Sequence, residues 1–136
     1  EFSIAYRSVS GPENEWFVAA NIRLKHGCSS VSKSRLRKLL EKRNVSQPIG
    51  SANAGAVFKN PPDDFAARRI GFCGVMGAGS GSAVVSGKHA NIIINTGGSS
   101  AADIESLIHH VQSVVAEKTG IELQTEVHII GEPAQD

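Results

Sequence analysis

The sequence has few of the features that mark secreted, membrane-spanning or nucleic-acid-binding proteins. Its 136 residues include only two cysteines, Cys28 and Cys73, which are too few and too far apart for a disulfide framework or a zinc site. No apolar run approaches the ~20 residues that span a bilayer. The formal net charge is +1, so no strong field draws the chain to nucleic acid. These absences predict a globular protein of a reducing compartment, with no metal site and with neither nucleic acid nor membrane as a partner.

What is present suffices for one compact core, because 40% of the residues are hydrophobic. Apolar residues alternate in EWFVAANIRLKHG, residues 15–27, which predicts a half-buried strand. The turn residues 11–14 precede it, so we expect a hairpin in which residues 2–8 pair with this strand.

A basic segment follows at residues 32–43. Leu36, Leu39 and Leu40 have helical spacing there, with charged residues between them, which predicts a surface helix. Its cations are typical of a solvated face, although cations on adjacent turns also suit a phosphorylated ligand. The next residues, 44–64, are rich in Gly, Pro and Asn and predict a long loop.

The second half predicts helices and strands in alternation. Asp64 is expected to cap a short helix within residues 63–74, and Ser100 and Gly120 to begin and end a longer one. The expected strands are AVVS (83–86), NIIIN (91–95) and a final one from Ile121 onward. The predicted fold class is α+β, with a small mixed or wholly antiparallel sheet and helices packed on one face.

The glycine-rich stretch 77–83 raises the question of a dinucleotide site. A dinucleotide fingerprint needs a helix directly after the glycines, because the helix N-terminus holds the pyrophosphate. Here the glycines lead into strand-forming residues. The pattern therefore favours a turn between a helix and a strand.

Other reactive side chains give no clear constellation. His109 and His110 are adjacent and lack metal-ligand spacing, which favours solvated histidines. Cys73 has apolar neighbours, so we expect it to be buried rather than nucleophilic. From the residues alone, the chain is an α+β domain without an assigned chemistry.

Three motifs indicate a family. SANAGAVFKNPP (51–62), VVSGKHANIIINTG (84–97) and GIELQTEVHIIGE (120–132) resemble, in order, A-G-S-x-F-K-N-P, S-E-K-H-A-N-F-I-x-N-T-G and G-x-x-L-x-x-E-V-x-x-I-G. These patterns occur in the C-terminal part of UDP-N-acetylenolpyruvoylglucosamine reductases. AYRSV (5–9) is similar to the family's G-Y-R-x-S. The resemblance covers nearly the whole chain.

The resemblance implies an activity. Enzymes of this family reduce the enolpyruvyl group of UDP-N-acetylglucosamine enolpyruvate, which yields UDP-N-acetylmuramate for peptidoglycan. NADPH reduces a bound FAD, and the flavin delivers hydride to the double bond. The resulting anion beside the carboxylate needs charge stabilisation and a proton.

The resemblance also implies site residues. Arg7 matches the arginine that stabilises the enolate, and Glu126 matches the glutamate that works with it. The substrate-binding positions are Tyr6, Lys59, Asn60, Lys88 and His89. Without the resemblance, Arg7 and Glu126 read as surface charges.

The chain departs from the family at the proton donor. The serine of A-G-S-x-F falls on Ala56, whose methyl group has no proton to give. Either water or a nearby hydroxyl such as that of Ser51 replaces it, or the chain is a UDP-sugar-binding module without catalysis. Ser46 also replaces the lysine that usually precedes Gln-Pro, which weakens an expected substrate contact.

The resemblance finally implies a domain organisation. Residues 1–27 are expected to be the terminal hairpin of an FAD-binding region, and residues 28–136 the substrate-binding C-terminal domain. The FAD-binding domain precedes the matched part in the family, so we expect it to be a partner that this chain lacks. The family's location is cytoplasmic.

Overall fold

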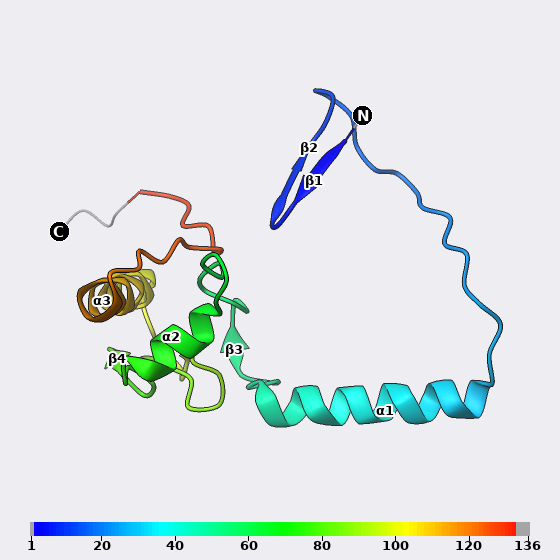
Figure 1. Cartoon of the computed structure of the whole chain (residues 1–136). Coiled ribbons are helices and arrows are strands. Elements are labelled where there is room, and N and C mark those ends of the chain that lie inside the picture. Colours follow the sequence, from blue (N-terminus) through cyan, green and yellow to red (C-terminus); the bar gives the residue numbers. More distant parts are fainter. Residues whose placement is uncertain (1, 133–136) are drawn as a thin grey trace. The chain divides into compact units, whose positions relative to one another are not determined.

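A computed structural model describes residues 2–132 of the chain (Figure 1). Its internal contacts form two compact units, residues 1–38 and residues 39–136. Each unit is described by itself below. Within the described residues, no helix is both long and apolar enough to cross a membrane.

The first unit contains a short hairpin. Strand β1 (Ser3–Ala5) pairs antiparallel with β2 (Ser8–Ser10). The predicted pairing of residues 2–8 with residues 15–27 is therefore wrong. Residues 15–27 form no strand and are exposed throughout. Alternation makes a segment suited to a sheet, but a strand also needs a hydrogen-bonding neighbour, and the described residues give this segment none.

Helix α1 (Ser29–Ser46) confirms the predicted basic helix and extends it by three residues at each end. All of its residues are exposed, including the predicted apolar stripe at Leu36, Leu39 and Leu40.

The second unit is a small α+β fold, as predicted. Its four-stranded sheet has the order β3 (Ala52–Asn53), β6 (Ile93–Asn95), β5 (Ala83–Val85) and β4 (Gly79–Ser80). All of its strand pairs are antiparallel, which decides between the two sheet types that the sequence left open. Helix α3 (Ala101–Thr119) packs on β4 and β5, and α2 (Ala66–Phe72) packs beside α3 (Figure 1).

The core of this unit lies between the sheet and the two helices. Its most buried large side chains are Phe58, Ile70, Val85, Leu107, Val111 and Val115. The predicted strands 83–86 and 91–95 are confirmed as β5 and β6, and Cys73 is buried as expected.

Helix α3 has the predicted ends. The Ser100 side chain accepts a hydrogen bond from the Asp103 backbone N–H, and the Asp103 carboxylate accepts one from the Ser100 N–H, so both orphan donors are satisfied. Gly120 ends the helix in the left-handed conformation, with φ 70°.

Two expectations for the other elements are wrong. Asp64 does not cap α2; the capping position is Phe65, and the first helical N–H, that of Ala66, donates to the Asn60 side chain. The final strand from Ile121 is reduced to one bridge, Phe58 with Thr125. The N–H groups of Glu126 and Val127 both donate to one carbonyl, that of Val57. Because two residues share one partner, the hydrogen-bond ladder is interrupted there, as in a β-bulge.

Candidate functional site

Two of the motif segments lie side by side in the second unit. The Lys59 N–H donates to the Gln124 carbonyl at 2.8 Å, and the Glu126 N–H donates to the Val57 carbonyl at 2.8 Å. The predicted proton-donor position, Ala56, and the predicted acid, Glu126, therefore belong to neighbouring strands of backbone. Both side chains are partly exposed, as is that of Lys59.

The third motif joins them through Asn91. The Asn91 backbone carbonyl accepts from the Val57 N–H at 3.0 Å. Its side-chain Oδ1 accepts from the Phe58 N–H at 2.9 Å, and its Nδ2 donates to the Phe58 carbonyl at 2.8 Å. Asn91 is 5% exposed, so these bonds are shielded from water.

Lys88 and His89 lie on a turn that Ser86 holds. The buried Ser86 hydroxyl accepts from the Lys88 N–H at 3.1 Å and from the His89 N–H at 3.3 Å. The Lys88 side chain is exposed. The Nδ1 atom of His89 is buried and has no hydrogen-bond partner within the described part of the chain.

The side chain of Asn60 forms a hydrogen bond within the protein. Its side-chain Oδ1 accepts from the Ala66 N–H at 3.1 Å, which ties the Lys59–Asn60 segment to the start of α2. The predicted substrate-binding asparagine thus also has a structural role.

Asp64 reinforces the same connection. Its carboxylate accepts from the Phe65 N–H at 2.7 Å, from Arg68 Nε at 2.6 Å and from Arg69 Nε. The Phe65 N–H first, and then the two guanidinium groups, hold the pKa of Asp64 below its usual range.

Tyr6 and Arg7 belong to the first unit. They form the turn between β1 and β2, and Arg7 has a positive φ of 55°. The Arg7 guanidinium lies 5.7 Å from the centre of the Tyr6 ring, within cation–π range. The predicted site residues are thus divided: six lie in the second unit and these two in the first.

Sequence reasoning assigned no role to Ser86 or Asn91, and it gave Asp64 only the role of a helix cap. Ser86 and Asn91 stand in the quoted V-S-G-K-H-A-N motif, and Asp64 follows K-N-P-P. A signal was present in their chemistry, because a short polar residue amid buried neighbours has to bind backbone groups.

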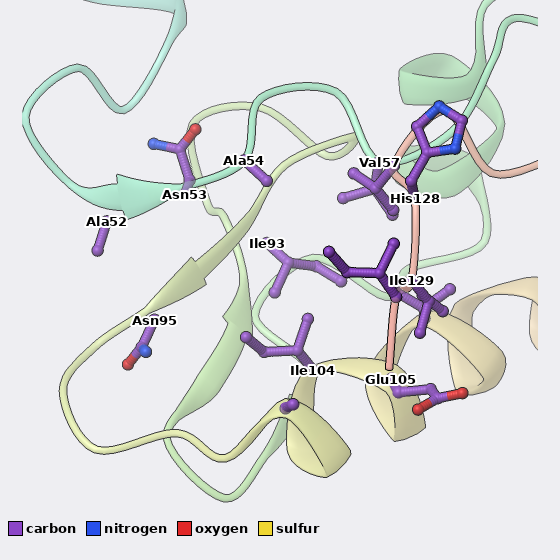
Figure 2. Close-up of a pocket in the computed structure, with 14 residues that line it drawn as sticks. Ala52, Asn53, Ala54, Val57, Ile93, Asn95, Ile104, Glu105, His128 and Ile129 are labelled. Carbon is purple, nitrogen blue, oxygen red and sulfur yellow. The ribbon is translucent and has the colours of Figure 1, made fainter. Parts of the chain in front are cut away.

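The second unit also contains an apolar cavity of about 470 Å³ (Figure 2). Ile93, Ile104 and Ile129 point into it, while the polar ends of Asn95 and Glu105 lie at its edge (Figure 2). None of the predicted catalytic or substrate-binding residues lines it. The lining does include Val57 and Val127, which are the sequence neighbours of Ala56 and Glu126, so the cavity lies next to these two predicted residues.

The glycine stretch does not fit a flavin pyrophosphate. Gly79 and Ser80 form β4, which turns at Gly81 and Ser82 into β5. A methyl group on Gly81 would lie 2.6 Å from the Asp103 carboxylate, so the glycine serves close packing against α3. The predicted turn is present, but it joins two strands, β4 and β5, rather than a helix and a strand. The described residues offer FAD no helix N-terminus after these glycines.

A metal centre has no candidate in the part of the chain that the structure describes. No group of three or more His, Cys, Asp or Glu side chains there is arranged to hold an ion. His109 and His110 are exposed on α3, as expected, and His109 lies 3.8 Å from Glu105 Oε1.

Comparison with known proteins gives a consistent result. Residues 47–130 match the family model of the UDP-N-acetylenolpyruvoylglucosamine reductase C-terminal domain. The reductase of that name from Nitrosococcus oceani is 52% identical over 134 residues, which are 98% of this chain and 45% of the relative. The one from Coxiella burnetii is 52% identical over 131 residues, 96% of this chain and 42% of the relative.

A solved structure extends the likeness to the fold. The crystal structure of the reductase from Thermus caldophilus aligns with a TM-score of 0.62 and 33% identity, over 76% of this chain and 37% of that one. This chain spans less than half the length of each relative. The matched model, that of the family's C-terminal domain, covers more than half of the chain. The chain therefore belongs to the UDP-N-acetylenolpyruvoylglucosamine reductase family.

Proposed function

We propose that this chain is the substrate-binding portion of a reductase that converts UDP-N-acetylglucosamine enolpyruvate to UDP-N-acetylmuramate for peptidoglycan. FAD and NADPH would serve the complete enzyme. The chain's own contribution is to bind the substrate and to stabilise the anion that reduction creates.

The main support is the junction of three motif segments in the second unit. Hydrogen bonds connect Val57–Lys59 to Gln124–Glu126 on one side and to Asn91 on the other. This junction holds the backbone of Lys59, of Glu126 and of Val57, the residue after position 56, in one fixed arrangement. A fixed arrangement of charged groups is what stabilisation of a developing anion requires.

The charges of the site residues suit the substrate. The substrate carries a carboxylate and a diphosphate, so it is strongly anionic. Arg7, Lys59 and Lys88 would supply positive charge to it, and Arg7 would face the enolate that forms. Glu126 would work with Arg7 at the substrate carboxylate, as the family resemblance implies.

FAD is assigned to a partner portion of the enzyme rather than to this chain. The glycine stretch forms a hairpin, which does not suit a dinucleotide phosphate. Residues 1–27 would complete that FAD-binding portion, and residues 28–136 would form the substrate domain. The exposed apolar residues Trp16, Val18, Ile22 and Leu24 support this division, because exposed apolar side chains are typical of a surface that another part of a protein covers. We propose a cytoplasmic location for the complete enzyme.

A second function has one observation in its favour. Ala56 stands where the family has its proton donor. A chain that keeps the binding residues and lacks the donor would bind a UDP-sugar without reducing it. The two proposals agree on binding and differ on turnover.

Calorimetric titration of UDP-N-acetylglucosamine enolpyruvate into the chain tests the shared part. We expect saturable binding that weakens by about tenfold or more in Arg7→Ala, since a charge-assisted contact is lost. Arg23→Ala is the matched control, because it removes the same charge from an exposed position of the same unit. An absence of binding, or equal weakening in both variants, would refute the substrate site.

Turnover decides between the two functions. The chain is joined to the part of the Nitrosococcus oceani relative that it does not cover, and NADPH oxidation is followed with FAD and substrate present. Substrate-dependent oxidation supports the reductase, and tight binding without oxidation supports the binding module.

A further inference from the structure

Asn91, in the motif segment 84–97, forms three hydrogen bonds with the motif segment 51–62. Its backbone carbonyl and both side-chain polar atoms bind one dipeptide, Val57–Phe58, and Phe58 is 33 residues away in the chain. Both Val57 and Phe58 are buried, at 4% and 2% exposure. With Oδ1 accepting and Nδ2 donating, the side chain has a single orientation that satisfies it.

The contacts of Asn91 extend to the predicted site through two steps. The dipeptide that it holds also receives the Glu126 N–H at the Val57 carbonyl, and the next residue, Lys59, donates to Gln124. A shift of this segment by one residue would move Ala56 and Lys59 relative to Glu126. Asn91 thus holds the segment whose position decides which of these residues face one another.

We infer that Asn91 is a positioning residue of the substrate site: it sets the register of segment 56–60 against Glu126. The inference rests on the proposed function for the identity of the ligand. Asn91 acts through Phe58 and is not assigned a contact with the substrate.

Only some side chains can take this role. The Phe58 peptide needs an acceptor for its N–H and a donor for its carbonyl at one place. A carboxylate at position 91 would offer two acceptors, and one of them would face the Phe58 carbonyl oxygen. A protonated carboxyl group offers one acceptor and one donor, as the amide does. Asn91→Asp therefore turns the register contact into one that depends on pH.

The experiment compares the wild-type chain, Asn91→Asp and Val115→Ala at about pH 5 and about pH 8, values on either side of the raised pKa expected of a buried carboxyl. Val115→Ala is the control for stability, because Val115 is fully buried in α3 and makes none of these hydrogen bonds. Affinity for UDP-N-acetylglucosamine enolpyruvate is measured by calorimetry, and amide exchange protection of Lys59 and Glu126 by NMR. The ionisable side chains on the connected segments are Lys59, Lys88, His89 and Glu126; all three proteins contain them, so each variant is compared with wild type at the same pH.

At about pH 8 we expect Asn91→Asp to bind about tenfold or more weakly than wild type and to lose protection at both amides, with its helices intact by circular dichroism. At about pH 5 both properties should return to within about threefold of wild type, since the protonated side chain restores both bonds. Val115→Ala should match wild type at both pH values. Wild-type affinity and protection in Asn91→Asp at both pH values would overturn the inference, as would an equal loss in Val115→Ala.

The experiment also gives a decision in two further cases. If the ionised carboxylate of the Asn91→Asp variant unfolds the chain, Asn91→Ala is measured below its unfolding temperature. A tenfold loss of affinity there supports the inference, and unchanged affinity overturns it. If wild type binds no substrate, the proposed function fails, and the amide protection of Lys59 and Glu126 alone decides whether Asn91 sets the register.

Discussion

The Glu126 N–H donates to the carbonyl of Val57, which makes the residue after the proton-donor position a direct neighbour of the proposed acid. The two residues are 69 positions apart in the sequence. The Val127 N–H shares the same carbonyl, at 3.4 Å, so the backbone turns at this point instead of continuing as a strand. A bulge of this kind can change the direction of side chains, and Glu126 stands in it.

This geometry predicts a specific effect of Glu126→Gln. The amide keeps the size of the side chain but removes the carboxyl group that we propose works with Arg7 at the substrate carboxylate. In the enzyme completed with the Nitrosococcus oceani portion, turnover should fall by about a hundredfold, the effect of losing one anion-stabilising group. Substrate affinity should change by less than about threefold.

Glu122→Gln is the control for that change, because Glu122 is an exposed glutamate of the same segment. Steady-state NADPH oxidation gives both kinetic constants. Equal turnover in the two variants would remove Glu126 from the mechanism.

We expect the substitution Ala56→Ser to raise turnover. The new hydroxyl would stand at the partly exposed position that carries the donor in the family, and a positioned general acid contributes about 10²-fold or more. Turnover of the completed enzyme should rise by that factor. Ala54→Ser adds the same hydroxyl two residues earlier, at an exposed site, and should leave turnover unchanged. An unchanged rate in Ala56→Ser would mean that another group supplies the proton.

Gly120→Ala predicts a loss of stability. Gly120 ends α3 with φ 70°, where a Cβ costs about 1–2 kcal/mol. Gly87→Ala is the control, because Gly87 has no positive φ and open space around it. That change should leave stability unchanged or raise it by up to ~1 kcal/mol. Urea unfolding followed by circular dichroism measures both, and equal values would contradict the assignment of the cap.

Local signals were enough to predict the elements whose causes are local. Helix α3 is predictable because Ser100, Asp103 and Gly120 stand at its ends and its apolar residues keep helical spacing. Strands β5 and β6 follow from short β-branched runs. Alternation in residues 15–27 predicted a strand and failed, because pairing depends on a neighbour that the local sequence does not specify.

In the site, too, the local sequence predicts some features, and others depend on distant segments. The family motifs indicated Ala56, Lys59 and Glu126, but not how they are connected. That connection depends on Asn91 and on a shared carbonyl at Val57, which are contacts between distant segments. Likewise, Asp64 was expected to cap α2, yet its carboxylate binds two arginines of that helix, and Asn60 binds the first helical N–H.

Asp64 gives the chain a predictable response to acid. Its pKa is lowered in the folded state, by the Phe65 N–H first and then by Arg68 and Arg69. A lowered pKa means that the ionised form stabilises the fold above the unfolded pKa, and that this stability is lost as pH falls through the folded pKa.

Asn at this position keeps an acceptor for the Phe65 N–H and removes the charge. Asp64→Asn should therefore lower the melting temperature by a few degrees at pH 7, and the difference from wild type should shrink at acidic pH, below the usual range of an aspartate. Asp63→Asn, at the exposed neighbouring residue, should show little difference at either pH. Thermal unfolding across this pH series would contradict the assignment if the Asp64→Asn difference stayed constant.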